Sequence, residues 1–143
     1  LHAASPTHIA VGDIDGNNQD DAIIDFGSGS GVWIRYNNTS WTQLHAATSQ
    51  ILATGDLDGS GKDDVLIDFG ASGLFVRYNN ATWVKLHSTS PVNIGGADLD
   101  SSGKDDAVID FGGSLDLYVR YNNATWTKLS TLATQAIVGG GFD

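Results

Sequence analysis

Clusters of aspartates recur three times along this chain, with a spacing that can hold a metal ion. Each cluster reads Asp-x-Asp, then a turn of small or polar residues, then Asp-Asp. The members are Asp13, Asp15, Asp20 and Asp21; Asp56, Asp58, Asp63 and Asp64; and Asp98, Asp100, Asp105 and Asp106. With the aspartate of a following Asp-Phe-Gly, five per repeat over three repeats give 15 of the 17 acidic residues, and glutamate is absent. A merely solubilising surface would mix both acids, so this selective use indicates coordination geometry.

Counted from its first aspartate, each loop offers oxygen ligands at every second position. Side chains supply the first, third, fifth and ninth positions, and a backbone carbonyl supplies the seventh. The predicted ligands are Asp13, Asp15, Asn17, Gln19 and Asp21; Asp56, Asp58, Ser60, Lys62 and Asp64; and Asp98, Asp100, Ser102, Lys104 and Asp106. A flexible loop with mixed oxygen donors suits the about 6 to 8 ligands of Ca²⁺ better than the strict octahedron of Mg²⁺. Zinc is disfavoured because the chain has no cysteine. We therefore predict Ca²⁺ as the cofactor.

Two other interpretations of the loops compete with a calcium site of this kind. An EF-hand needs a glutamate at position 12, where this chain has Ile24, Ile67 or Ile109. A single Asp-rich turn is most simply explained by Asx turns that bind no ion. Threefold recurrence with the same alternation of ligands favours metal coordination over that simpler explanation.

The whole chain follows the period of the clusters. Asp13, Asp56 and Asp98 are separated by 43 and then 42 residues. The repeats are residues 1–43, 44–85 and 86–128, and residues 129–143 begin a fourth copy. Each repeat contains four short apolar or alternating segments between turn residues, which predicts four strands. Four strands per period of about 40 to 50 residues are typical of a propeller blade. We therefore expect an all-β propeller of four-stranded antiparallel blades, with three blades and one extra closing strand.

Composition limits the possible partners. The net charge of −10 argues against nucleic acid, which attracts basic surfaces, and it suits cations. No apolar run approaches the roughly 18 residues of a membrane span. We expect a modest calcium affinity, in the range of about 10⁻⁴ to 10⁻³ M for extracellular modules. We also expect an extracellular or cell-surface location.

The segment Gly-Asp-Leu-Asp-Gly-Ser-Gly-Lys-Asp-Asp at 55–64, which runs into an apolar strand and Phe-Gly, resembles the FG-GAP or VCBS-type repeat. The resemblance covers essentially the whole chain. That family includes the integrin α-subunit propeller and similar seven-bladed fungal lectins. It implies a β-propeller with calcium in the loop between the first two strands of a blade. Ser101 replaces the usual glycine in the third loop, and Gly141 replaces the first aspartate in the fourth fragment.

Aromatic and basic residues recur with the same period. Trp41, Trp83 and Trp126, with His45 and His87 four residues after the first two, can be core residues or stack on a sugar ring. Arg35, Arg77 and Arg120 are expected to be structural, through ion pairs with Asp25, Asp68 and Asp110 or through hydrogen bonds. Asn-Asn pairs precede each tryptophan and favour tight turns.

These patterns favour a calcium-stabilised binding module, a multivalent carbohydrate-binding lectin with sites repeated in each blade. The alternative is a structural or protein-interaction propeller without a small-molecule ligand, as a designed or excised repeat unit would be. We expect no enzyme, because no asymmetric catalytic arrangement stands apart from the repeat. Three blades are fewer than the about four to eight of closed propellers. We therefore expect the ring to be closed by a homo-oligomer or by a longer parent chain.

Overall fold

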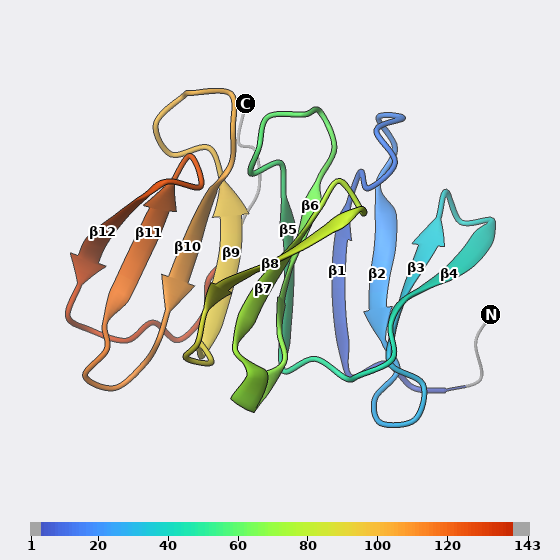
Figure 1. Cartoon of the computed structure of the whole chain (residues 1–143), viewed down its shortest axis with the longest axis horizontal. Coiled ribbons are helices and arrows are strands. Elements are labelled where there is room, and N and C mark those ends of the chain that lie inside the picture. The colour runs from blue at the N-terminus through green and yellow to red at the C-terminus, as the bar shows by residue number, and fades with distance from the viewer. Residues whose placement is uncertain (1–3, 139–143) are drawn as a thin grey trace.

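The computed structural model describes residues 4–138, which contain twelve strands and one short 3-10 helix. The strands form three antiparallel sheets of four, and in each sheet the strand order follows the chain (Figure 1). The first sheet contains β1 (His8–Gly12), β2 (Asp21–Asp25), β3 (Val32–Tyr36) and β4 (Ser40–His45). The second contains β5 (Ile51–Gly55), β6 (Asp64–Asp68), β7 (Leu74–Tyr78) and β8 (Thr82–His87), with η1 (Gly70–Ser72) between β6 and β7. The third contains β9 (Asn93–Ala97), β10 (Asp106–Asp110), β11 (Leu117–Tyr121) and β12 (Thr125–Ser130). The predicted all-β class and four-stranded antiparallel sheets are confirmed.

The hairpin between the third and fourth strands of each sheet depends on its Asn-Asn pair. Asn37 and Asn38 have φ angles of 47° and 55°, and the Thr39 N–H donates to the Tyr36 carbonyl at 2.8 Å. Positive φ at both central residues is what a tight two-residue hairpin requires, and asparagine tolerates it better than other non-glycine residues. The Asn-Asn pairs are therefore turns, as the sequence predicted.

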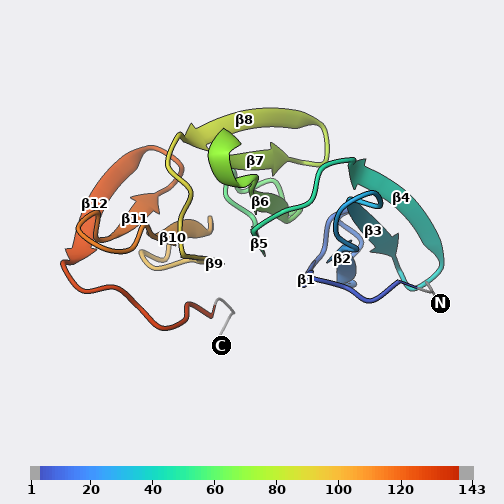
Figure 2. The same ribbon diagram turned by 90° about the horizontal axis from the view of Figure 1, so that it is seen from below.

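The three sheets lie side by side along an arc (Figure 2). The first strand of each sheet is on the inner side of the arc, and the fourth is on the outer side. β5 contacts both β1 and β9, so the inner strands connect neighbouring sheets. This arrangement is consistent with part of a propeller. The closing strand is expected within residues 129–143. Of these, 129–130 belong to the end of β12, 131–138 carry no strand, and 139–143 lie outside the described residues.

Apolar side chains fill the two junctions between sheets. Between the first and second sheets lie Ile14, Ile23, Val32, Ile34, Val65 and Ile67. Between the second and third lie Leu57, Leu66, Leu74, Val76, Ile94, Ala107, Ile109 and Phe111. The second sheet has a neighbouring sheet on each side and therefore buries both of its faces. This explains why β6 is apolar at successive positions. Among the described residues, no helix is long and apolar enough to cross a membrane.

Buried aspartates at the ends of the second strands fasten each sheet to the segment that follows it. Asp25 accepts hydrogen bonds from the Thr48 hydroxyl at 2.7 Å, the Ser49 N–H at 2.6 Å and the Gly27 N–H at 2.7 Å. Burial alone would raise the pKa of Asp25, but these donors lower it overall. Asp110 has the same arrangement with Thr134, and its pKa is also lowered despite burial.

Asp68 differs from the other two because Pro91, after the second sheet, occupies the position that Ser49 has after the first sheet. Proline has no N–H, so Asp68 lacks a counterpart of the hydrogen bond that the Ser49 N–H donates to Asp25. The Ser90 hydroxyl still donates to the Asp68 carboxylate. Burial consequently raises the pKa of Asp68, since the remaining hydrogen bonds from Ser90 and Gly70 do not offset it.

Replacing Asp25 with asparagine should lower the free energy of unfolding by about 2 kcal/mol, because buried donors lose a charged acceptor. Asp68→Asn is the matched comparison and should cost less. Because folding lowers the pKa of Asp25, its carboxylate contributes fully to the free energy of unfolding above its ordinary pKa of 3.8. This contribution is lost as the pH falls through the lower pKa of the folded state. Urea unfolding of both variants from pH 7 to pH 2 measures this. Equal losses for the two variants at neutral pH would contradict the role of Ser49.

Candidate functional sites at the loops and junctions

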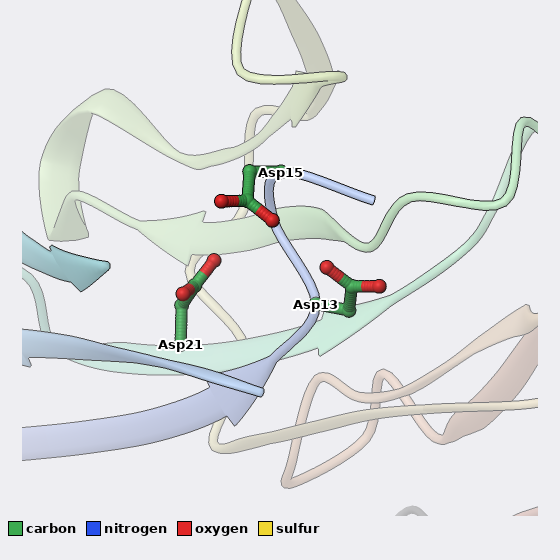
Figure 3. A group of neighbouring side chains, drawn as sticks. All are labelled: Asp13, Asp15 and Asp21. Atoms are coloured by element: carbon green, nitrogen blue, oxygen red, sulfur yellow. The ribbon is translucent and has the colours of Figure 1, made fainter. Parts of the chain in front are cut away.

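The loop between the first two strands of each sheet brings three carboxylates together. The groups are Asp13, Asp15 and Asp21; Asp56, Asp58 and Asp64; and Asp98, Asp100 and Asp106. Within each group, one ligand oxygen per residue lies within 4.8 Å of the others. Figure 3 shows that the side chains of the first group turn toward a common space. The structure thus assembles nine of the predicted ligands into three candidate metal sites.

The backbone of each loop wraps around its first aspartate. Asp13 accepts hydrogen bonds from the N–H groups of Gly16, Asn17 and Asn18, at 2.7, 3.0 and 2.6 Å. Partial desolvation opposes ionisation, but these N–H groups lower the pKa of Asp13 overall. Asn18 has a φ of 64°, and Gly61 occupies the same place in the second loop with a φ of 80°. The sixth position of both loops therefore has a left-handed backbone, which glycine and asparagine tolerate.

Burial and like charge act on the third carboxylate of the second group. Asp64 is buried at the start of β6, and desolvation followed by the charges of Asp58 and Asp56 raises its pKa to about 7, against the N–H of Asn79. Carboxylates held this close repel one another, and a divalent cation between them would relieve the repulsion. Their donor atoms are all oxygens, which is the ligand type that calcium takes. The residues present therefore fit such an ion.

An asparagine from the distant hairpin completes each loop, and sequence analysis had interpreted it only as a turn residue. Asn37 donates its side-chain amide to Asp15 at 2.9 Å and its backbone N–H to Asp21 at 2.8 Å. Asn79 and Asn122 make the same pair of hydrogen bonds in the other sheets. The sequence signal was the repetition of Tyr-Asn-Asn, but nothing in it pointed to the loops.

The residues at the fifth position turn toward this asparagine. Ser60 donates to the side-chain oxygen of Asn79 at 2.6 Å, and Asn17 donates to that of Asn37 at 2.6 Å. Ser102 does the same with Asn122 at 2.7 Å. Coordination by Asn17, Ser60 and Ser102, and by the carbonyls of Gln19, Lys62 and Lys104, stays a prediction.

Neighbouring loops are clasped to one another by an aspartate that sequence analysis left without a role. The N–H of Asp63 donates to the carbonyl of Asp13 at 2.8 Å, and the Asp13 N–H donates to the Asp63 carboxylate at 2.9 Å. Asp105 and Asp56 make the equivalent pair at 2.8 and 3.0 Å. Burial raises the pKa of Asp63 to about 6, with a further contribution from the charge of Asp105, against the hydrogen bond from Asp13. The candidate metal sites are therefore linked across the blade junctions.

The predicted tryptophan and histidine residues meet at the junctions. The His45 ring lies 4.4 Å from Phe69 and 5.6 Å from Trp83 of the next sheet, between ring centroids. His87 lies 4.4 Å from Phe111 and 5.9 Å from Trp126. We call each such group of histidine, phenylalanine and tryptophan an aromatic niche. On the first sheet, at the end of the array, the ring centroids of Trp41 and Phe26 are 5.8 Å apart.

The repeated arginines lie over the tryptophans. The guanidinium of Arg77 lies 5.2 Å from the ring centroid of Trp83 and donates to the carbonyls of Ala81 and Asn80. Arg35 and Arg120 lie similarly over Trp41 and Trp126. The arginines are thus structural, as expected, through hydrogen bonds to the hairpin and contact with an aromatic ring.

Comparison with known proteins supports the fold. No family model matches the chain, so the resemblance to FG-GAP or VCBS-type repeats stays a resemblance. No curated protein sequence matches it. A solved lectin of Agrocybe aegerita, which recognises non-reducing terminal N-acetylglucosamine, superposes with a TM-score of 0.62 at 17% sequence identity. This chain therefore shares the fold of part of that lectin. The superposition covers 89% of this chain and 40% of that lectin, so the chain spans less than half of the lectin's length.

Asn79 offers a test of the link between hairpin and loop. Asn79→Gly keeps the backbone able to adopt the φ of 49° but loses the amide bridge to Asp58, and should cost about 1 kcal/mol of unfolding free energy. Asn79→Ala loses the same bridge and, unlike the glycine variant, keeps a Cβ at this left-handed φ without the polar group that lets asparagine adopt it, which costs about 1 to 2 kcal/mol more. Thermal unfolding at fixed protein concentration compares them. An alanine variant as stable as the glycine variant would contradict this assignment.

Proposed function

We propose that this chain is a calcium-stabilised, multivalent carbohydrate-binding module with a sugar site at each blade junction. The observation that carries the proposal is the aromatic niche, which recurs at both internal junctions with a histidine from one sheet against a phenylalanine and a tryptophan of the next. Aromatic faces stack on the apolar face of a sugar ring, and an imidazole can hydrogen-bond its hydroxyls.

The second niche opens into a hollow of the size a small ligand needs. The hollow has a volume of about 250 Å³. Its lining residues are His87, Phe111, Leu115, Tyr118 and Trp126. Ligand sites for drug-sized molecules begin near about 300 Å³ and combine apolar walls with a few polar groups. A single sugar residue suits this slightly smaller, mostly apolar hollow.

The similar lectin from Agrocybe aegerita supports the ligand class. Its recognition of terminal N-acetylglucosamine makes glycans ending in that sugar the first to test. Repetition of a weak site along one rigid array would raise avidity on a surface that carries many glycans. Such surfaces are extracellular, which agrees with the location we propose for the protein.

Calcium would act on the fold and not on the sugar directly. Bound among the carboxylates of one loop, the ion would supply a positive charge that cross-links the loop to the first residue of the second strand. Hydrogen bonds within the chain orient the carboxylates of the loop. Asn79 donates its side-chain amide to Asp58 and its backbone N–H to Asp64. The clasp between Asp63 and Asp13 carries this order to the neighbouring sheet.

Sugar binding is tested by removing one niche at a time. Trp126→Ala or Trp83→Ala should each remove about 1 kcal/mol of aromatic contact, and so weaken binding at that junction about fivefold. Val84→Ala is the matched control, because Val84 follows Trp83 in β8 and is exposed. Titration with N-acetylglucosamine-terminated oligosaccharides, followed by tryptophan fluorescence and calorimetry, measures the change. Failure of the unmodified protein to bind any member of a broad glycan array would contradict the proposal and favour a structural or protein-interaction function.

Calcium binding is tested independently of sugars. At a tenfold excess over Kd, each bound ion should add about 1.4 kcal/mol to the unfolding free energy. Asp58→Asn should remove the gain from the second loop, whereas Asp116→Asn should keep it, since Asp116 pairs with Lys128 outside the loops. Calorimetric titration with Ca²⁺ and, separately, Mg²⁺ counts the sites and their selectivity. Unfolding curves identical in calcium and in chelator would contradict metal stabilisation.

A further inference from the structure

The second aromatic niche has a wall that is built differently from that of the first. Residues 69–73 join β6 to β7 beside the first niche, and residues 111–116 join β10 to β11 beside the second. After Phe69, the first connection has only glycine, alanine and serine. The second connection is one residue longer and brings Leu115 into the lining of the hollow, together with His87 of the preceding sheet. It lies at the edge of the array opposite to the candidate metal sites (Figure 1).

A turn and an ion pair hold Leu115 at the rim of this hollow. The Leu115 N–H donates to the Gly112 carbonyl at 3.0 Å, and the Phe111 N–H donates to the Asp116 carbonyl at 3.1 Å. Asp116 has a φ of 71°, which aspartate tolerates better than most non-glycine residues. Its carboxylate pairs with Lys128 of β12. Leu115 is 51% exposed, so a ligand that covers it gains by removing apolar surface from water.

The surroundings of the first niche differ in charge. In the second sheet, Lys85 and Gly73 stand where the third sheet has this lysine and Asp116. Glycine offers no carboxylate, and the Lys85 ammonium lies over Phe75, 5.7 Å from its ring centroid. Tyr118 holds the position of Phe75 in the third sheet and lines the hollow. The first niche therefore has a cation beside it, whereas the second has a phenol hydroxyl.

His87 gives the hollow a hydrogen-bond donor. Its Nδ1 accepts the N–H of Thr89 at 3.0 Å, so the neutral ring carries its proton on Nε2. Within residues 4–138, the Nε2–H group has no hydrogen-bond acceptor. A donor and an aliphatic side chain in one hollow match an acetamido group, whose carbonyl oxygen accepts a hydrogen bond and whose methyl group is apolar. A hydroxyl group at the same place on a sugar would leave Leu115 uncovered.

We propose that the two junctions bind different sugars, and that Leu115, positioned by Asp116, makes the second junction selective for sugars with an acetamido group. This selectivity rests on the proposed carbohydrate binding. At the second junction, the sugar ring stacks on Trp126, the acetamido methyl group packs on Leu115, and the acetamido carbonyl accepts a hydrogen bond from His87. At the first junction, the ring stacks on Trp83, and sugars with and without this group bind equally well.

NMR signals of the indole N–H groups of Trp83 and Trp126 report the two junctions separately in the unmodified protein. In titrations with N-acetylglucosamine and with glucose, the Trp126 signal should give a dissociation constant about fourfold lower for N-acetylglucosamine, the effect of burying about one methyl group. The Trp83 signal should give equal constants for the two sugars. Equal constants at Trp126, or the same preference at both signals, would overturn the proposed selectivity and leave carbohydrate binding standing. Binding of neither sugar at either signal would overturn both.

Leu115→Ser removes the aliphatic wall at an exposed position, so the protein should still fold. The preference at the Trp126 signal should disappear through a weaker affinity for N-acetylglucosamine, while the affinity for glucose stays unchanged. Leu129→Ser is the matched control, because Leu129 is 47% exposed on β12 and does not line the hollow. A preference that Leu115→Ser retains, or that Leu129→Ser loses, would overturn the role of Leu115.

Exchanging residues 70–73 for the sequence of residues 112–116 tests whether this connection carries the selectivity. The added aspartate can pair with Lys85, as Asp116 pairs with Lys128. The Trp83 signal should then acquire an about fourfold preference for N-acetylglucosamine. A folded exchange variant without this preference would overturn the assignment of selectivity to the connection. Should the exchange prevent folding, the titration of Leu115→Ser alone decides.

Discussion

Two buried carboxylates bracket the second strand of every sheet, and most of the architecture depends on satisfying them. Asp21 begins β2 and Asp25 ends it, and both are buried. A buried carboxylate is unfavourable unless donors surround it. The donors here come from elsewhere in the chain: Ile14 from the preceding loop, Asn37 from the hairpin, and Ser49 from the segment that leads to the next sheet. The loop, the hairpin and the connection between sheets must therefore be correctly placed together.

Much of this could be predicted from the sequence because the repeat removes ambiguity. A single Asp-rich turn has several explanations, but three copies with the same alternation define both the period of the sheets and the carboxylates that meet. The alternation of apolar residues and the glycine and asparagine turns then fix the four strands of each period. The triads of Asp13, Asp56 and Asp98 with their partners are accordingly where the spacing predicted them.

The contacts that sequence analysis missed join positions far apart or in different repeats. Asn37 reaches Asp15 across 22 residues, and its turn propensity hid that second role. The clasp between Asp63 and Asp13 crosses 50 residues. It depends on how neighbouring sheets stack, which a pattern within one repeat does not encode. Pro91 is visible in the sequence, but its effect on Asp68 follows only from the hydrogen bonds seen in the equivalent pair of Asp25 and Ser49.

The clasp between loops has a direction: an aspartate always reaches from a later blade back to an earlier one. The array therefore has a direction along the arc, and each blade contacts the one before it in the same way. Insertion or deletion of a whole repeat would leave both outer surfaces unchanged and would require no redesign of the interior. Gene duplication could thus vary the size of such proteins in steps of one blade, while a cut within a blade would expose its buried carboxylates.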